Sequence, residues 1–171
     1  MPVAFRDLLP VLGCALAALL VGVLPYWLDL FTLLSLTIYL VMALLALSLA
    51  FIWGFGGILC FGQAAFFGLG AYAYAIGVLN IGDSTWPVLL AIVVPALFAA
   101  AMGYFMFYGG ISDVYLGVIT LAVTLILFNV MNSTSGSEYH IGSALLGGFN
   151  GIPAIPTLNV PFDPERVLEP E

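Results

Sequence analysis

Charged side chains are scarce in this chain of 171 residues: 6% are charged, whereas 64% are hydrophobic. Soluble domains average about 25% charged residues. The chain therefore has too few charged groups to cover a water-facing surface, and its mean hydropathy of +1.22 is typical of an integral membrane protein. Its 2 basic residues cannot neutralise a phosphate backbone, which excludes nucleic acid as a partner.

The sequence also lacks the residue patterns of catalytic and metal sites. Cys14 and Cys60 lie inside apolar runs, where cysteine acts as a small hydrophobic residue, and no CxxC motif or His/Cys cluster is present. No HExxH, GxSxG or P-loop pattern occurs. We therefore expect no catalytic residue, no metal ligand and no cofactor, and a chain that is not an enzyme.

Long hydrophobic runs dominate what is present. A spanning helix needs about 20 mostly apolar residues. Runs of this kind predict spans near residues 8–28, 31–53, 58–79, 86–108 and 111–131. The expected fold class is all-α, a polytopic membrane helix bundle with about five transmembrane helices over residues 1–131.

Residues 132–171 differ in composition, because they are rich in Gly, Ser, Asn and Pro. They predict an extramembrane loop and an acidic tail. Arg6 is the only basic residue before position 166, and it favours a cytoplasmic N-terminus. Five spans would then place residues 132–171 on the periplasmic side.

The stretch WGFGGILCFGQAAFFGLGAYAY, residues 53–74, combines many glycines with one uncharged polar side chain, Gln63. A plain membrane anchor needs no such pattern. Glycine lets helices approach closely or break, and a break inside a bilayer survives only against protein or a water-filled cavity. We therefore predict a glycine-rich broken or re-entrant segment beside a polar path. A tight loop between the second and third spans is the alternative.

The candidates for a substrate path are residues that would offer polar groups inside the bundle. Gln63 carries amide donors and an acceptor, although an interhelical hydrogen bond that only fixes packing is the alternative. Gly57 and Gly62 would free backbone groups at a helix end. Thr120 and Thr124 lie on one face of the fifth span, unless their hydroxyls bond only to their own helix.

Small residues spaced four apart also recur near Gln63. The pairs are Ala64 with Gly68 and Ala73 with Gly77. Because lipid offers no hydrophobic drive for helix association, such pairs predict close helix packing.

A family resemblance covers much of this pattern. The run LALSLAFIWGFGGILCFGQAAFFGLGAYAYAIGVL, residues 45–79, resembles the permeases of bacterial ABC importers for branched-chain amino acids and urea, most of all the LivM-like or UrtC-like subunit. DVYLGVITL at 113–121 and GFNGIP at 148–153 are similar to later motifs of that family, in the same order. Gln63 stands where the family usually has histidine, and the turn before the fifth span lacks the usual basic residues.

The resemblance implies a permease subunit of an ATP-driven importer in the bacterial inner membrane, on the path of branched-chain amino acids or urea-like small amides. It implies a second permease subunit, cytoplasmic ATPase subunits and a periplasmic substrate-binding protein as partners, besides the lipid bilayer. Family permeases continue with further spans, so the chain would correspond to their N-terminal part, with the C-terminal half of the domain missing. The alternative is a non-transporting assembly or regulatory subunit, or an inactive truncated permease.

Overall fold

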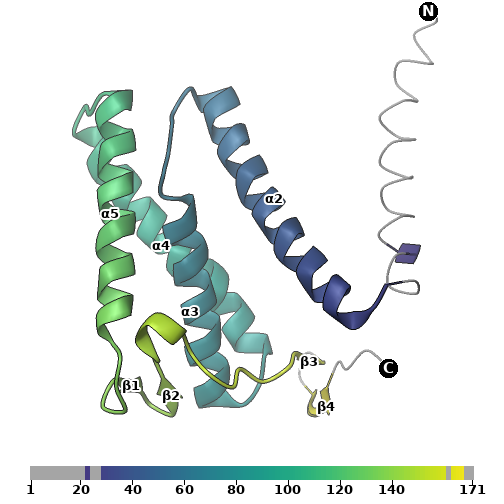
Figure 1. Cartoon of the computed structure of the whole chain (residues 1–171). Helices are drawn as coiled ribbons and strands as arrows, with labels where there is room; N and C mark the ends of the chain where they lie inside the picture. Colours follow the sequence, from purple (N-terminus) through teal and green to yellow (C-terminus); the bar gives the residue numbers. More distant parts are fainter. Residues whose placement is uncertain (1–21, 24–27, 161–162, 168–171) are drawn as a thin grey trace, which may run out of the picture. The chain divides into compact units, whose positions relative to one another are not determined.

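Helices account for most of the structure, a computed structural model that describes residues 22–23, 28–160 and 163–167 (Figure 1). The long helices are α2 (Leu30–Gly56), α3 (Gln63–Ile81), α4 (Thr85–Tyr108) and α5 (Asp113–Ser133). The shorter elements are β1 (His140–Ile141), β2 (Ala144–Leu145), the 3-10 turn η2 (Gly148–Asn150), β3 (Asn159–Val160) and β4 (Asp163–Val167).

The 4 helices from α2 to α5 are each long and apolar enough to cross a membrane. The expected spans 31–53, 86–108 and 111–131 correspond closely to α2, α4 and α5. The third expected span, 58–79, differs, because residues 57–62 are not helical and α3 begins only at Gln63. The first expected span, 8–28, falls on residues of which only 22, 23 and 28 are described.

The chain divides into two compact units, residues 1–46 and 47–171, which are described separately. In the first unit, the hydroxyls of Ser35 and Thr37 donate to carbonyl oxygens one turn earlier in α2, at 3.0 Å. These side chains are therefore satisfied within their own helix. The second unit contains the end of α2, the helices α3 to α5 and the segments that follow them.

Left-handed glycines end two of the helices. Gly57 follows α2 with φ +67°, and Gly82 follows α3 with φ +78°. The N–H of Gly82 donates to the carbonyl of Val78 at 2.9 Å, which closes the last turn of α3. Residues with a side chain rarely adopt this conformation, so glycine fixes where each helix stops.

The helices α3 and α4 form the closest packed pair, and glycine makes the contact possible. A Cβ atom at Gly70 would lie 2.8 Å from the carbonyl oxygen of Ala91 in α4. Pro95 has no N–H, so this carbonyl lacks its usual helical donor and is free to face α3. At Gly77, a Cβ atom would lie 3.1 Å from Pro87. The pair therefore depends on two glycines opposite two prolines.

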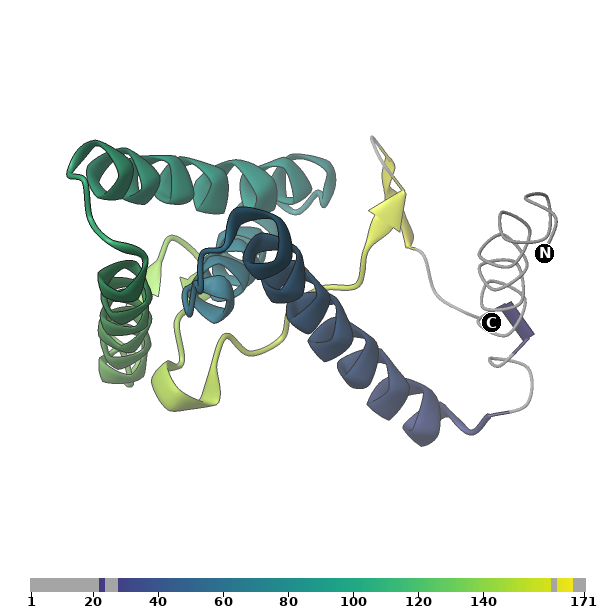
Figure 2. The ribbon, with the colours of Figure 1, turned by 90° about the horizontal axis from the view of Figure 1, so that it is seen from above.

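The view from above shows how α4 and α5 are inclined to each other. In Figure 2, α5 is seen nearly along its axis, whereas α4 lies across the view. In Figure 1, α4 passes behind α3 toward the start of α5. The helix α4 is therefore strongly inclined to α5, and the two do not run parallel along their whole length.

The region after α5 contains more regular structure than the expected loop and tail, 132–171. The strands β1 and β2 pair antiparallel, with His140 opposite Leu145 and Ile141 opposite Ala144. The strands β3 and β4 form a second antiparallel pair. Strands of 2 to 5 residues are too short to show a periodic pattern, which is why the sequence alone indicated only a loop.

Replacing Gly70 with alanine is expected to destabilise the α3–α4 pair. The added methyl group would meet the backbone carbonyl of Ala91, and overpacking of this kind costs about 1–3 kcal/mol. The measurement is the free energy of unfolding in a titration with SDS. Gly68→Ala is the matched control, since its Cβ atom would meet nothing within 4 Å. Equal stability of the two variants would contradict the packing described for Gly70.

Candidate functional site

The non-helical segment 57–62 is bonded to the side of α5. The N–H of Phe61 donates to Thr120 Oγ1 at 3.1 Å. Thr124 Oγ1 donates to the carbonyl of Phe61 at 3.2 Å and to the carbonyl of Thr120 at 2.8 Å. The two hydroxyls thus supply both hydrogen-bonding partners that the backbone of Phe61 lacks outside a helix.

Close approach of this segment to α5 depends on Gly117. A Cβ atom at this position would lie 3.1 Å from the carbonyl oxygen of Leu59. Gly117, Thr120 and Thr124 follow one another along one face of α5, at helical spacing. This face is therefore shaped to hold a stretch of irregular backbone.

The contact lies near the middle of α5. Each helical residue advances about 1.5 Å, so Thr120 and Thr124 lie roughly 10 and 16 Å from the start of the helix. The whole helix of 21 residues is about 31 Å long, close to the thickness of a bilayer hydrocarbon core. If α5 crosses a bilayer, Phe61 lies at mid-depth.

Gln63, Gly62 and Gly57 lie at or beside this segment. The side chain of Gln63, half-buried at the first residue of α3, accepts a hydrogen bond from Ser48 Oγ at 3.1 Å. Gly62 is buried, and a Cβ atom there would lie 3.1 Å from the ring of Phe66. Gly57 borders a hollow of ≈ 390 Å³ that it shares with Asp113.

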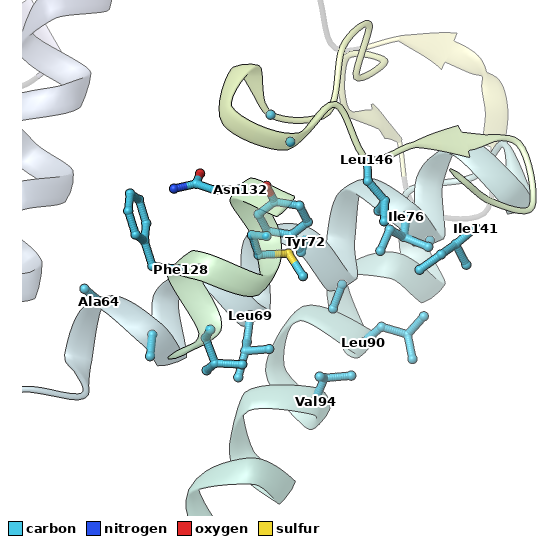
Figure 3. Close-up of a pocket in the computed structure, with 18 of the residues that line it drawn as sticks. Ala64, Leu69, Tyr72, Ile76, Leu90, Val94, Phe128, Asn132, Ile141 and Leu146 are labelled. Atoms are coloured by element: carbon cyan, nitrogen blue, oxygen red, sulfur yellow. The ribbon is translucent and has the colours of Figure 1, made fainter. Parts of the chain in front are cut away.

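A larger cavity of ≈ 870 Å³ lies among α3, α4, α5 and the segment 141–151 (Figure 3). Its lining is mostly aliphatic and aromatic, and the described residues that form it include no aspartate, glutamate, lysine, arginine or histidine. The polar members of the lining are Tyr72, Asn80, Thr124, Asn132 and Asn150. A cavity of this size and composition falls within the range of small-molecule sites, about 300–1,000 Å³.

The predicted site residues divide between the segment and the cavity. Thr124 belongs to both, because it bonds to Phe61 and lines the cavity. Gln63, Gly62, Gly57 and Thr120 do not line the cavity.

The small residues predicted to pack helices have two different surroundings. All four of them line the cavity, namely Ala64, Gly68, Ala73 and Gly77. Gly77 also lies against Pro87, whereas a Cβ atom at Gly68 would meet nothing within 4 Å. Gly70 was not predicted as a packing residue, although it lies seven residues before Gly77 on the same face of α3.

Asn80 holds the segment 141–151, which borders the cavity, against the end of α3. Its Nδ2 donates to the carbonyl of Ile141 at 3.0 Å and to that of Ile76 at 2.8 Å, and its Oδ1 accepts from Ser143 N at 3.0 Å. The hydroxyl of Ser143 also donates to the carbonyl of Leu79. The end of α3 is thereby joined to the hairpin β1–β2.

Asn159, at the start of β3, is bonded to the turn between α3 and α4. Its Oδ1 accepts from Ser84 N at 2.8 Å, and its Nδ2 donates to Asp83 Oδ1 at 3.0 Å. These bonds hold the pKa of the Asp83 carboxyl below its usual value, chiefly through the Asn159 side chain and then through the backbone N–H of Thr85. No sequence pattern points to this pairing, because the partners lie 75 and 76 positions apart.

Among the described residues, no group of three or more His, Cys, Asp or Glu side chains would hold a metal ion. The chemistry available at the segment and cavity is hydrogen bonding by neutral groups and contact with apolar surface.

Comparison of the chain with family models, curated proteins and solved structures finds no match. The class that the fold defines is a mostly helical protein whose described residues include 4 helices long and apolar enough to cross a membrane, which is compatible with a multi-pass membrane protein.

Replacing Thr120 with valine is expected to release the segment 57–62. The variant leaves the part-buried N–H of Phe61 without its acceptor, and an unsatisfied group of this kind costs up to about 1–3 kcal/mol. Hydrogen exchange at the Phe61 amide should then accelerate by roughly tenfold or more, since 1.4 kcal/mol is a factor of ten.

Thr37→Val serves as the matched control for this measurement, because the Thr37 hydroxyl bonds only to its own helix. Its exchange rate at Phe61 should equal that of the unmodified chain. An unchanged rate in Thr120→Val would show that the hydroxyl does not hold the segment.

Proposed function

We propose that this chain is a permease subunit of an ATP-driven importer in a bacterial inner membrane. It forms part of the transmembrane path for branched-chain amino acids or urea-like small amides. The observation that carries the proposal is the non-helical segment 57–62, held by Thr120 and Thr124 near the middle of α5. Irregular backbone is tolerated at membrane depth only against protein or water, and transporters use such interruptions at their substrate sites.

The position of the cavity supports a path at this place. Thr124 bonds to the segment with its hydroxyl and also lines the cavity. The interrupted backbone therefore adjoins a space of ≈ 870 Å³. A tether that only anchors a protein has no use for either feature.

The three runs that resemble importer permeases meet in the same unit of the structure. Residues 45–79 supply the segment and α3, and residues 113–121 supply Gly117 and Thr120 on α5. Residues 148–153 contribute four consecutive members of the cavity lining, from Gly148 to Gly151. Runs far apart in sequence thus build one local arrangement, which favours a shared function over chance similarity.

The proposed partners follow from the energy source. The sequence carries no P-loop, so in this proposal separate cytoplasmic ATPase subunits hydrolyse ATP. A second permease subunit completes the path through the membrane. A periplasmic binding protein delivers the substrate at the face that carries the hairpin β1–β2 and η2.

The test is reconstitution in proteoliposomes with the ATPase subunits, second permease subunit and binding protein of an importer of this class. Uptake of labelled leucine or urea and substrate-stimulated ATP hydrolysis should both require this chain. Gly117→Val should lower uptake by roughly tenfold, because displaced binding groups cost large factors in rate. Gly103→Val is the control, since a Cβ atom there would make only ordinary contacts, at 3.7 Å.

A complex that forms with this chain, yet takes up substrate equally well without it, would contradict the proposal. That result would instead favour an assembly or regulatory subunit.

A further inference from the structure

Two spaces follow one another along the same helix, α5. The hollow of ≈ 390 Å³ is lined on α5 by residues between Asp113 and Leu121, and the cavity of ≈ 870 Å³ by residues between Thr124 and Asn132. Leu121 and Thr124 are three residues apart, so the two linings come within about 4.5 Å of each other along the helix. If α5 crosses a bilayer, the hollow lies in one half of its depth and the cavity in the other half.

The segment 57–62, the link between α2 and α3 in Figure 1, lies at the boundary of the two spaces. Gly57 and Phe61 line the hollow, whereas Ala64, near the start of α3, lines the cavity. The carbonyl of Phe61 accepts a hydrogen bond from Thr124, which belongs to the cavity lining. The backbone at Phe61 therefore separates the hollow from the cavity.

Both threonines that hold Phe61 also have a partner in their own helix. Thr120 Oγ1 accepts from the N–H of Phe61 and donates to the carbonyl of Gly117 at 2.9 Å. Thr124 Oγ1 shares its hydrogen between the carbonyls of Phe61 and Thr120. When Phe61 moves away, both hydroxyls keep a partner within α5, so release of the segment leaves neither of them unsatisfied.

Glycine stands at both ends of the segment. Gly57 has φ +67°, and a Cβ atom there would meet nothing within 4 Å. Gly62 directly precedes α3, with φ −78° and ψ −5°. Because glycine changes its backbone dihedrals at little steric cost, the segment can turn at these two residues. In the described part of the chain, the hydrogen bonds between the segment and α5 are the two made by Phe61.

We infer that the segment 57–62 is a gate between the hollow and the cavity. In the closed state, which is the one described above, Phe61 is bonded to Thr120 and Thr124 and the two spaces are separate. In the open state these bonds are broken, the segment has turned at Gly57 and Gly62, and the spaces join along α5. Water in the joined space then bonds to the N–H and carbonyl of Phe61. Passage of a substrate rests on the proposed function, whereas the movement requires only this chain.

A gate of this kind differs from the rocking of whole repeats, by which many transporters change access. Rocking would carry the segment together with α5 and leave the bonds of Phe61 intact. Local release breaks these bonds while α5 stays in place. Removing the hydroxyls of Thr120 and Thr124 therefore changes access to the two spaces only if the segment is the gate.

The test measures from which side of the membrane each space is reached by water. In a chain freed of thiols by Cys14→Ala and Cys60→Ala, Leu121→Cys places one thiol in the hollow and Leu127→Cys places one in the cavity. The probe is a membrane-impermeant methanethiosulfonate with a trimethylammonium group, added to spheroplasts and to inverted membrane vesicles of a bacterial expression host. With the gate closed, the two thiols should be modified from opposite sides.

The combined variant Thr120→Val and Thr124→Val should open the gate. Modification of each thiol from its disfavoured side should become at least tenfold faster, because both bonds of Phe61 are lost. The serine pair at the same positions keeps the hydroxyls and should restore the one-sided pattern. Thr124→Val alone, which leaves the bond to Thr120, should give a smaller increase and serves if the double variant does not fold.

The matched control removes two hydroxyls that bond only within α2, by Ser35→Ala and Thr37→Val. Its modification rates should equal those of the thiol-bearing parent chains. Modification of both thiols from the same side in the parent chains would overturn the inference, because the segment would then separate nothing. Unchanged rates in the valine variants would also overturn it, and would favour rocking of whole helices.

Failure of this test and failure of the import test have different meanings. Unchanged sidedness together with intact substrate uptake would reject the gate and leave the proposed function standing. Altered sidedness in a chain that supports no uptake would retain the gate and reject the importer.

Discussion

The structure depends on one constraint, which is that backbone polar groups outside a helix need other partners, most of all if the helices around them cross a bilayer. At Phe61 the helix ladder supplies none, and the hydroxyls of Thr120 and Thr124 replace it. Gly117 lets the same segment come close enough for these bonds to form. The cavity follows from this arrangement, because α3 begins beside the middle of α5 and leaves space between the two helices that the segment 141–151 covers.

A second constraint acts where α3 meets α4. Helix association in a membrane relies on close contact between surfaces, because lipid is as apolar as the helices. Gly70 and Gly77 bring α3 against Ala91 and Pro87 of α4. With one face of α3 used in this way, its small residues Ala64, Gly68 and Ala73 remain on the cavity side. Gly77 belongs to both surroundings, because it lies against Pro87 and also lines the cavity.

Length and hydropathy were enough to predict α2, α4 and α5, because a membrane span is defined by composition more than by distant contacts. Length and hydropathy wrongly predicted a helix at residues 58–62, because Ile58, Leu59 and Phe61 are as apolar as the residues of a spanning helix. The end of α2 there is decided by Gly57 and by threonines about 60 positions further on. Thr124 was predicted to lie on a substrate path, and it lines the cavity, which exists only because the folded chain brings α3 and α5 together.

The central claim is that the segment 57–62 lies deep in the membrane, and the depth of Phe61 tests it most directly. In a chain whose native tryptophans are replaced by phenylalanine, Phe61→Trp fluorescence is quenched by lipids brominated at different positions along the acyl chain. The account predicts strongest quenching by bromines near the chain ends, roughly 10–16 Å below the surface. Tyr108→Trp, at the end of α4, should be quenched most by bromines near the headgroups. Shallow quenching at both positions would contradict the account, because residues 57–62 would then be an ordinary surface loop.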